Sequence, residues 1–187
     1  MGGRGSSSNI SNNISKSLEK IRTLKKETLL VFDKDGKIIY TELGNNKHVG
    51  YENISYKDKI VAHNHPEGVY PYPSKKDFET MEKSGMKQMI VVSQNYNYYY
   101  EINKKYKGYG RTGLSYLIEQ NNSRLSEGRK KINQQTYEKA KKGGYKSNQE
   151  YRQDTIKKQT QYMNSELKKL AKNSGYNLKI TKRQQKG

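Results

Sequence analysis

Five short runs rich in apolar residues, all within the first 102 positions, constrain the fold more than any other feature of the sequence. Short runs of this kind, rich in Val, Ile, Phe and Tyr and bounded by turn residues such as the Asp-Gly pair at 35–36, are typical of β-strands. The runs are residues 27–32, 37–43, 59–63, 88–93 and 96–102. Between the third and fourth runs we expect a helix that is capped by Ser74 and ends at Gly85. This order of strands and helix predicts a mixed α/β sheet.

The rest of the chain has a different composition. Residues 1–15 are mainly Gly, Ser and Asn and are expected to form a flexible leader, which leaves residues 16–107 as the α/β domain. Residues 108–187 are expected to form a basic α-helical extension with at most a short strand at 177–180. Because only 30% of the chain is hydrophobic, below the ~45–50% that is usual when glycine is counted, we do not expect one core shared by every residue.

The formal charge of +19 is concentrated in the second half of the chain. Residues 1–102 carry 15 Lys or Arg and 12 Asp or Glu, whereas residues 103–187 carry 22 and 6. Such asymmetry raises the expectation that residues 103–187 bind nucleic acid. Lysine outnumbers arginine 30 to 7, however, and specific phosphate recognition favours arginine. An ordinary solvated helical surface is therefore the alternative.

Two absences restrict the chemistry. The chain has no cysteine, so any metal must be held by His, Asp or Glu. It also has no apolar run long enough to span a membrane and no apolar stretch typical of a signal peptide. The sequence thus predicts a soluble, cytoplasmic protein with no membrane partner.

Two histidines at the end of the third predicted strand carry the clearest chemical signal. Side chains two positions apart on a strand point the same way, so His63 and His65 can direct both imidazoles at one point. Asp77 lies in the first turn of the next predicted helix. Two imidazoles and one carboxylate are a common ligand set for a catalytic Zn²⁺ whose fourth position holds water. These three residues are therefore predicted to bind zinc.

A zinc hydrolase also needs a carboxylate that takes a proton from the water and passes it to the leaving amine. Glu42, at the end of the second predicted strand, is the candidate, and Glu52 is the alternative. The spacing of Ser74 and Asp77 also fits a capping box, which needs no metal and is compatible with the metal site. The third histidine, His48, is expected to be a surface residue.

These motifs resemble those of a known superfamily. His63-Asn64-His65-Pro66 with Pro73-Ser74-x-x-Asp77, preceded by a strand-borne Glu, is similar to the JAB/JAMM (MPN) metalloproteases. The His-Asn-His-Pro form is closest to the RadC-like branch and to JAB-like domains found in bacterial and phage toxin contexts. The resemblance covers about residues 28–102. One departure is the loop between His65 and Ser74, which has eight residues where the family usually has seven.

The resemblance implies a cytidine-deaminase-like α/β/α fold. It further implies Zn²⁺ held by His63, His65 and Asp77, Glu42 as the acid/base and Ser74 as a group that stabilises the oxyanion. The expected partner is a protein or peptide substrate, including a conjugated modifier, and a phage-encoded member would act in the host cytoplasm. The leading hypothesis is therefore a zinc-dependent metalloprotease or isopeptidase.

Two other classes remain as alternatives. A nucleic-acid-binding or nuclease-type effector would use the basic region 103–187. A metal-bound but inactive scaffold would use the same ligands to present a surface to a protein partner. The contiguous His-Asn-His is not the nuclease motif of similar spelling, whose residues are spread over a longer element.

Overall fold

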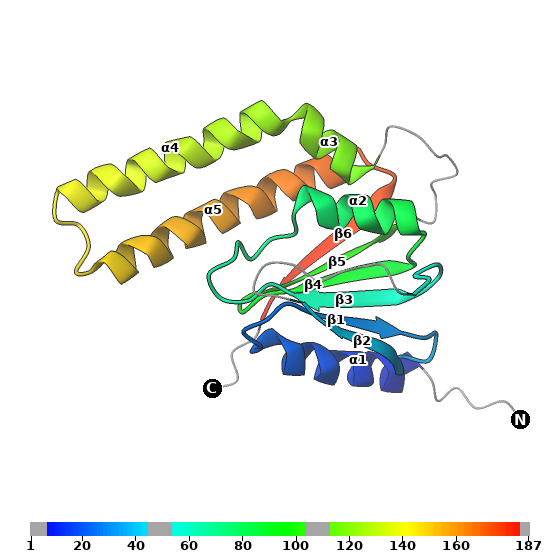
Figure 1. The fold of residues 1–187 in the computed structure, drawn as a ribbon. Helices are drawn as coiled ribbons and strands as arrows, with labels where there is room; N and C mark the ends of the chain where they lie inside the picture. Colours follow the sequence, from blue (N-terminus) through cyan, green and yellow to red (C-terminus); the bar gives the residue numbers. More distant parts are fainter. Residues whose placement is uncertain (1–6, 45–53, 104–112, 184–187) are drawn as a thin grey trace, which may run out of the picture.

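The computed structural model describes residues 7–44, 54–103 and 113–183, which form five helices and a six-stranded mixed sheet (Figure 1). The helices are α1 (Ser7–Arg22), α2 (Lys75–Ser84), α3 (Leu114–Gln120), α4 (Asn122–Lys141) and α5 (Asn148–Ala171). The strands are β1 (Thr28–Phe32), β2 (Ile38–Leu43), β3 (Ile60–Asn64), β4 (Gln88–Val92), β5 (Tyr96–Ile102) and β6 (Tyr176–Lys182). Across these described ranges, no helix has both the length and the apolar character needed to cross a membrane.

The strands lie in the order β2-β1-β3-β4-β5-β6. Only the pair β3 and β4 is parallel among the described strands, and α2 makes the crossover between them. All five strands predicted from the first 102 residues are confirmed. The predicted helix is confirmed as well, with Ser74 as its N-cap and Gly85 as its left-handed C-cap.

Helices cover both faces of the sheet (Figure 1). The apolar side chains of α1 pack on one face against the cluster formed by Leu30, Phe32, Ala62, Ile90 and Val92. The other face packs under α2, α3 and α5 through the cluster that includes Leu29, Val31, Val61, Met89 and Val91. Since side chains alternate along a strand, His63 belongs to the α2 face and Asn64 to the α1 face.

The prediction of a flexible leader over residues 1–15 is wrong from Ser7 onward, because α1 begins there. Ile14, Leu18 and Ile21 recur at helical spacing and are all buried on the sheet. These three apolar residues pack α1 on the sheet, and Arg22 at its end bonds to Ser93 and Asn97.

The C-terminal region is also not a separate helical extension. β6 pairs with β5 along its whole length and forms one edge of the sheet. Leu114, Met163 and Leu167 belong to the same buried cluster as the α2 face of the sheet. Residues 108–187, where described, therefore share their core with the α/β domain, and the strand expected at 177–180 is longer than predicted.

An ion-pair cluster joins α4 to α5 at the buried carboxylate of Glu166, which contacts Arg124 and, at 2.7 Å, Lys169. Burial alone raises the pKa of Glu166, but these two cations outweigh it, so the pKa lies below its usual 4.5.

We expect Glu166→Gln to lower the free energy of unfolding at neutral pH. A carboxylate whose pKa is lower in the folded than in the unfolded state stabilises the fold at pH values above its unfolded-state pKa. This stabilisation is lost as the pH falls through the folded-state pKa. Because both partners are largely exposed, the loss should be about 0.5–1 kcal/mol. Urea unfolding at pH 7 and pH 3 measures it, and an equal loss at both pH values would contradict the assignment.

Candidate metal centre

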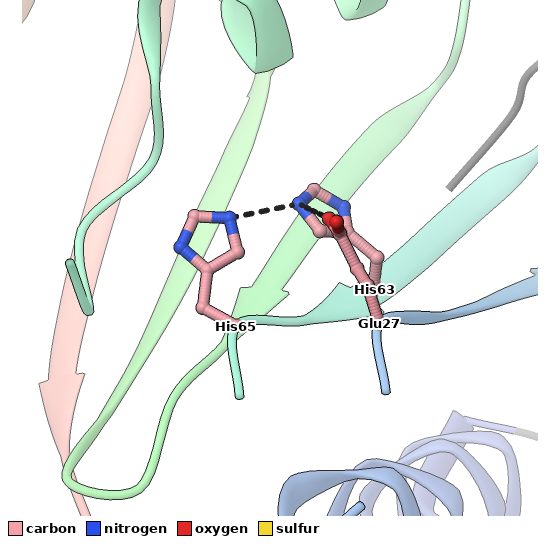
Figure 2. A group of neighbouring side chains, drawn as sticks. All are labelled: Glu27, His63 and His65. Carbon is pink, nitrogen blue, oxygen red and sulfur yellow. Dashed lines mark hydrogen bonds and ion pairs between the residues drawn. The ribbon is translucent and has the colours of Figure 1, made fainter. Parts of the chain in front are cut away.

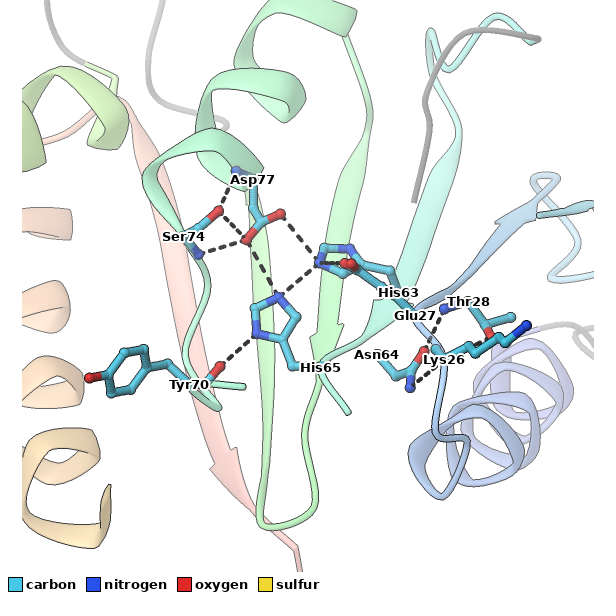
Figure 3. A network of polar contacts seen from close by, with 9 residues as sticks. All are labelled: Lys26, Glu27, Thr28, His63, Asn64, His65, Tyr70, Ser74 and Asp77. Atoms are coloured by element: carbon cyan, nitrogen blue, oxygen red, sulfur yellow. Dashed lines mark hydrogen bonds and ion pairs between the residues drawn. The ribbon is translucent and has the colours of Figure 1, made fainter. Parts of the chain in front are cut away.

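Four polar side chains converge at the carboxyl end of β3. His63 lies in β3, His65 follows it directly, and Asp77 lies in the first turn of α2. The fourth, Glu27, immediately precedes β1. All four are buried or nearly so, with exposed fractions of 8% or less. The structure thus brings the three predicted ligands together and adds Glu27 to them (Figures 2 and 3).

The distances between these side chains match those of metal ligands. The Nε2 atoms of His63 and His65 are 3.2 Å apart. Nε2 of His63 lies 3.3 Å from Oδ1 of Asp77, and Nε2 of His65 lies 3.6 Å from Oδ2. Nitrogen and oxygen ligands about 2.0–2.1 Å from a tetrahedral zinc lie about 3.3–3.4 Å from one another. The three distances are close to this spacing, with the two imidazoles approaching different oxygens of Asp77.

Asp77 is fixed in place by the start of α2. Its Oδ2 accepts hydrogen bonds from the backbone N–H of Ser74 at 2.6 Å and from the Ser74 hydroxyl at 2.7 Å. The Ser74 oxygen in turn accepts the backbone N–H of Asp77 at 3.2 Å, which completes the predicted capping box. The helix cap thus holds the carboxylate facing both imidazoles (Figure 3).

The loop after His65 orients its ring. Nδ1 of His65 donates to the backbone carbonyl of Tyr70 at 2.9 Å, because a carbonyl can only accept. A hydrogen bond at one ring nitrogen leaves the other, Nε2, directed at the cluster with a free lone pair in the neutral ring. The loop that follows His65 therefore orients this candidate ligand through the carbonyl of Tyr70.

The electrostatics of the cluster favour positive charge. Burial alone lowers the pKa of His65, but the hydrogen bond and the charge of Asp77 outweigh it, so the pKa is raised above its usual 6.5. Burial alone raises the pKa of Asp77, but His63 and His65 outweigh it and hold the pKa well below its usual range. A buried site that stabilises a protonated imidazole can also stabilise a divalent cation. Binding of the cation then displaces the imidazole proton.

Glu27 is the residue that the sequence reasoning missed. Its Oε1 lies 3.7 Å from Nε2 of His63, and its side chain lies beside that imidazole (Figure 2). Glu27, His63 and His65 offer ligand atoms that all lie within 4.8 Å of one another. Two carboxylates therefore face the imidazole pair. Asp77 approaches both rings and is held by the cap of α2, whereas Glu27 approaches His63, so both carboxylates are candidate ligands.

Glu42, the predicted general base, lies farther from the imidazoles. Leu29 pairs with Glu42 on one side and with His63 on the other, so Glu42 and His63 share a face but lie two strands apart. Two strand spacings are about 10 Å, and Leu29 occupies the space between them. The Glu42 carboxylate instead accepts a hydrogen bond from the Tyr40 hydroxyl at 3.1 Å. The alternative base, Glu52, and His48 lie outside the described residues.

Asn64 connects the histidine strand to the segment that carries Glu27. It is fully buried, and it points away from the histidines (Figure 3). Its Oδ1 accepts the backbone N–H of Thr28 at 2.7 Å, and its Nδ2 donates to the carbonyls of Leu24 and Lys26 at 3.2 Å. These hydrogen bonds therefore hold the backbone of the residues directly before and after Glu27, Lys26 and Thr28. Asn64 is thus a positioning residue for Glu27.

We expect Asn64→Ala to lower the free energy of unfolding by roughly 2–3 kcal/mol, because it leaves buried backbone groups without a partner. In the fraction that folds, the backbone around Glu27 should be held less firmly, because it loses its hydrogen bonds to Asn64. Thermal unfolding measures the first effect, and hydrogen exchange at the backbone amides of Glu27 and Thr28 measures the second. The matched control is Asn177→Ala, an exposed asparagine on β6. Unchanged exchange in the folded variant would contradict the positioning role.

Comparisons with protein-family models, with curated proteins and with solved structures find no match for this chain. The fold and the geometry of the cluster at His63, His65, Asp77 and Glu27 are therefore what indicates a function.

Proposed function

We propose that this protein is a zinc-dependent hydrolase of peptide or isopeptide bonds, of the JAB/JAMM type. His63, His65 and Asp77 would hold the zinc, and Glu27 would be the general base. The observation that carries this proposal is the convergence of two imidazoles and one clamped carboxylate at 3.2–3.6 Å, with a second carboxylate beside them. This set of ligands with an adjacent base is what metal-assisted hydrolysis requires.

The topology around the site supports the same class. Strands β3 and β4 are parallel neighbours, and α2 connects them. The ligands lie where β3 ends and α2 begins, and functional sites of α/β sheets commonly lie at the carboxyl ends of parallel strands. Helices on both faces of the sheet also agree with the α/β/α, cytidine-deaminase-like fold that the motif resemblance implies.

The chemistry can be divided among the chain's own residues. Zinc, when bound, supplies Lewis acidity that brings the pKa of a water towards ~7 and polarises the scissile carbonyl. The Glu27 carboxylate takes the proton of the attacking water and passes it to the leaving amine. The Ser74 hydroxyl is already used by Asp77, so we assign Ser74 to holding that ligand rather than to the oxyanion.

The experiment that tests the class uses the zinc-loaded full chain. It is incubated with a proteome-derived peptide mixture and, separately, with a Lys–Gly isopeptide conjugate, and new amines are identified by mass spectrometry. We expect cleavage of at least one of the two, loss of cleavage with a zinc chelator, and recovery on adding zinc. A fully zinc-loaded protein that cleaves neither would contradict the proposal and leave the inactive scaffold.

A further inference from the structure

A cavity of about 600 Å³ adjoins the metal centre on the side of His65. Its walls are the loop at residues 66–71, the turn between β4 and β5, one side of α5, and the end of β6. This volume lies within the range of about 300–1,000 Å³ that ligand pockets occupy. His65 is the member of the four-residue cluster that lines the cavity, so a molecule bound there can contact one proposed metal ligand.

The second half of the chain builds one side of this cavity. α5 contributes Ile156, Lys157 and Thr160, and the end of β6 contributes Lys182 and Arg183. α5 lies on the same face of the sheet as α2 and contacts β6, so these walls are parts of the packed domain. The cavity is therefore formed by the regions on both sides of the boundary expected from the sequence.

Buried and backbone contacts hold another wall of the cavity, the turn between β4 and β5. Arg22, at the end of α1, is buried and donates to the carbonyl of Ser93 and to Oδ1 of Asn97. The backbone N–H of Arg183 donates to the carbonyl of Asn95 at 2.8 Å. The turn between β4 and β5 is thus fixed from two sides, and a preformed wall costs little ordering entropy when a ligand binds.

The charged groups of the cavity favour a carboxylate ligand. Its cations are Lys157, Lys182 and Arg183, and its acid is Glu67. Arg183 is already paired with Glu19 at 3.0 Å. Among the described residues, Lys157 and Lys182 have no ion-pair partner. These two lysines are therefore available to a ligand.

The lining also has apolar parts. Val69 lies on the loop side, and Ile156, with 40% of its surface exposed, lies on the α5 side. A ligand with an apolar stem and an anionic end can contact both kinds of surface at once. An aspartate or glutamate side chain has this form, and it satisfies a lysine ammonium as a point charge.

We propose that this cavity binds an acidic side chain of the peptide substrate, next to the bond that is cleaved, and that Lys157 and Lys182 pair with its carboxylate. This inference rests on the proposed function, because it places the substrate's peptide bond at the metal centre. It identifies the substrate class as acidic peptides, selected by residues from α5 and β6.

The first test is a cleavage profile of the zinc-loaded chain on a proteome-derived peptide mixture. Asp and Glu should be enriched at one fixed position relative to the cleaved bond. In the double variant Lys157→Gln/Lys182→Gln, kcat/KM for acidic over matched amide peptides should fall about three- to tenfold, with zinc content unchanged. The matched control Lys168→Gln/Lys179→Gln changes one lysine on α5 and one on β6, neither of which lines the cavity. It should keep the preference.

A second test separates failure of the cavity from failure of the hydrolase. The probe is N-acetyl-Asp-Glu-amide, compared with N-acetyl-Asn-Gln-amide, in NMR titrations that follow the backbone amides of Ile156, Lys157 and Thr160. The acidic dipeptide should shift these amides in the wild type and not in the double variant. If it does so while no peptide is cleaved, the cavity assignment stands and the proposed function fails.

Two results would overturn the inference. One is cleavage without a preference for acidic residues, together with equal shifts from the two dipeptides; the hydrolase would then stand without the acidic subsite. The other is a titration in which a short oligothymidylate shifts the NMR signals of the same amides and the acidic dipeptide does not. The cavity would then serve a nucleic acid.

Discussion

Glu27→Gln should lower kcat for amide hydrolysis by about 10²–10⁴-fold, the usual contribution of a positioned general base. Zinc content should be unchanged, because the three ligands remain. The reason is geometric: the carboxylate lies 3.7 Å from Nε2 of His63, beside the ligands. Gln has nearly the same shape as Glu but cannot accept the proton. Steady-state kinetics and metal analysis of the same preparation measure both quantities.

The matched control is Glu42→Gln, the glutamate that the sequence alone favours. It lies two strands from His63 and is bonded to Tyr40, so its kcat should stay within about twofold of wild type. The account fails if Glu42→Gln abolishes hydrolysis and Glu27→Gln does not. Loss of zinc in Glu27→Gln would instead assign Glu27 as a ligand.

His63→Ala should remove tight zinc binding. Losing only a hydrogen-bonding partner of a metal ligand typically costs about 10–100-fold in affinity, so losing a ligand itself should cost more. Zinc binding also stabilises the folded state. With free zinc at about 1,000 times the dissociation constant, the wild type should gain about 4 kcal/mol of unfolding free energy, and His63→Ala should gain almost none.

Thermal unfolding with and without added zinc measures this difference. The matched control is His48→Ala, which removes the histidine that is not part of the predicted ligand set. It should keep the zinc-dependent rise in Tm. A variant His63→Ala that is stabilised by zinc as strongly as the wild type would show that the metal binds elsewhere.

Much of the fold could be predicted because local signals and tertiary packing agree. The runs at 27–32 and 88–93 are strongly apolar, and the Asp-Gly pair joins the first two strands. Ser74 and Gly85 mark the ends of α2. The alternation of a strand also explains why His63 and His65 face one point.

Other features depend on long-range packing that a local pattern does not identify by itself. Most of α1 is polar, and its Ile14, Leu18 and Ile21 are buried on the sheet. In β6, Tyr176, Leu178 and Ile180 alternate with polar residues, but this pattern does not show that the strand pairs with β5 along its whole length. The extent of the shared core was therefore underestimated from composition.

The candidate general base illustrates the same limit. Glu27 is the first residue of the first predicted strand and Glu42 lies near the end of the second, and the local sequence does not distinguish them. The pairing of β1 with β3 favours Glu27, because it places the start of β1 beside the end of β3, where the histidines lie. The usable signal was Glu27 at the start of the first predicted strand, whose partner in the sheet could not be read from the sequence.

X-ray absorption at the zinc edge of the purified, zinc-loaded chain tests the central claim most directly. The account predicts equimolar zinc in a four-coordinate shell of nitrogen and oxygen ligands at about 2.0–2.1 Å, with the outer-shell scattering of two imidazoles. In His63→Ala the scattering of one imidazole should disappear. Zinc that does not bind, or a spectrum without imidazole scattering, would contradict the assignment of His63, His65 and Asp77 as its ligands.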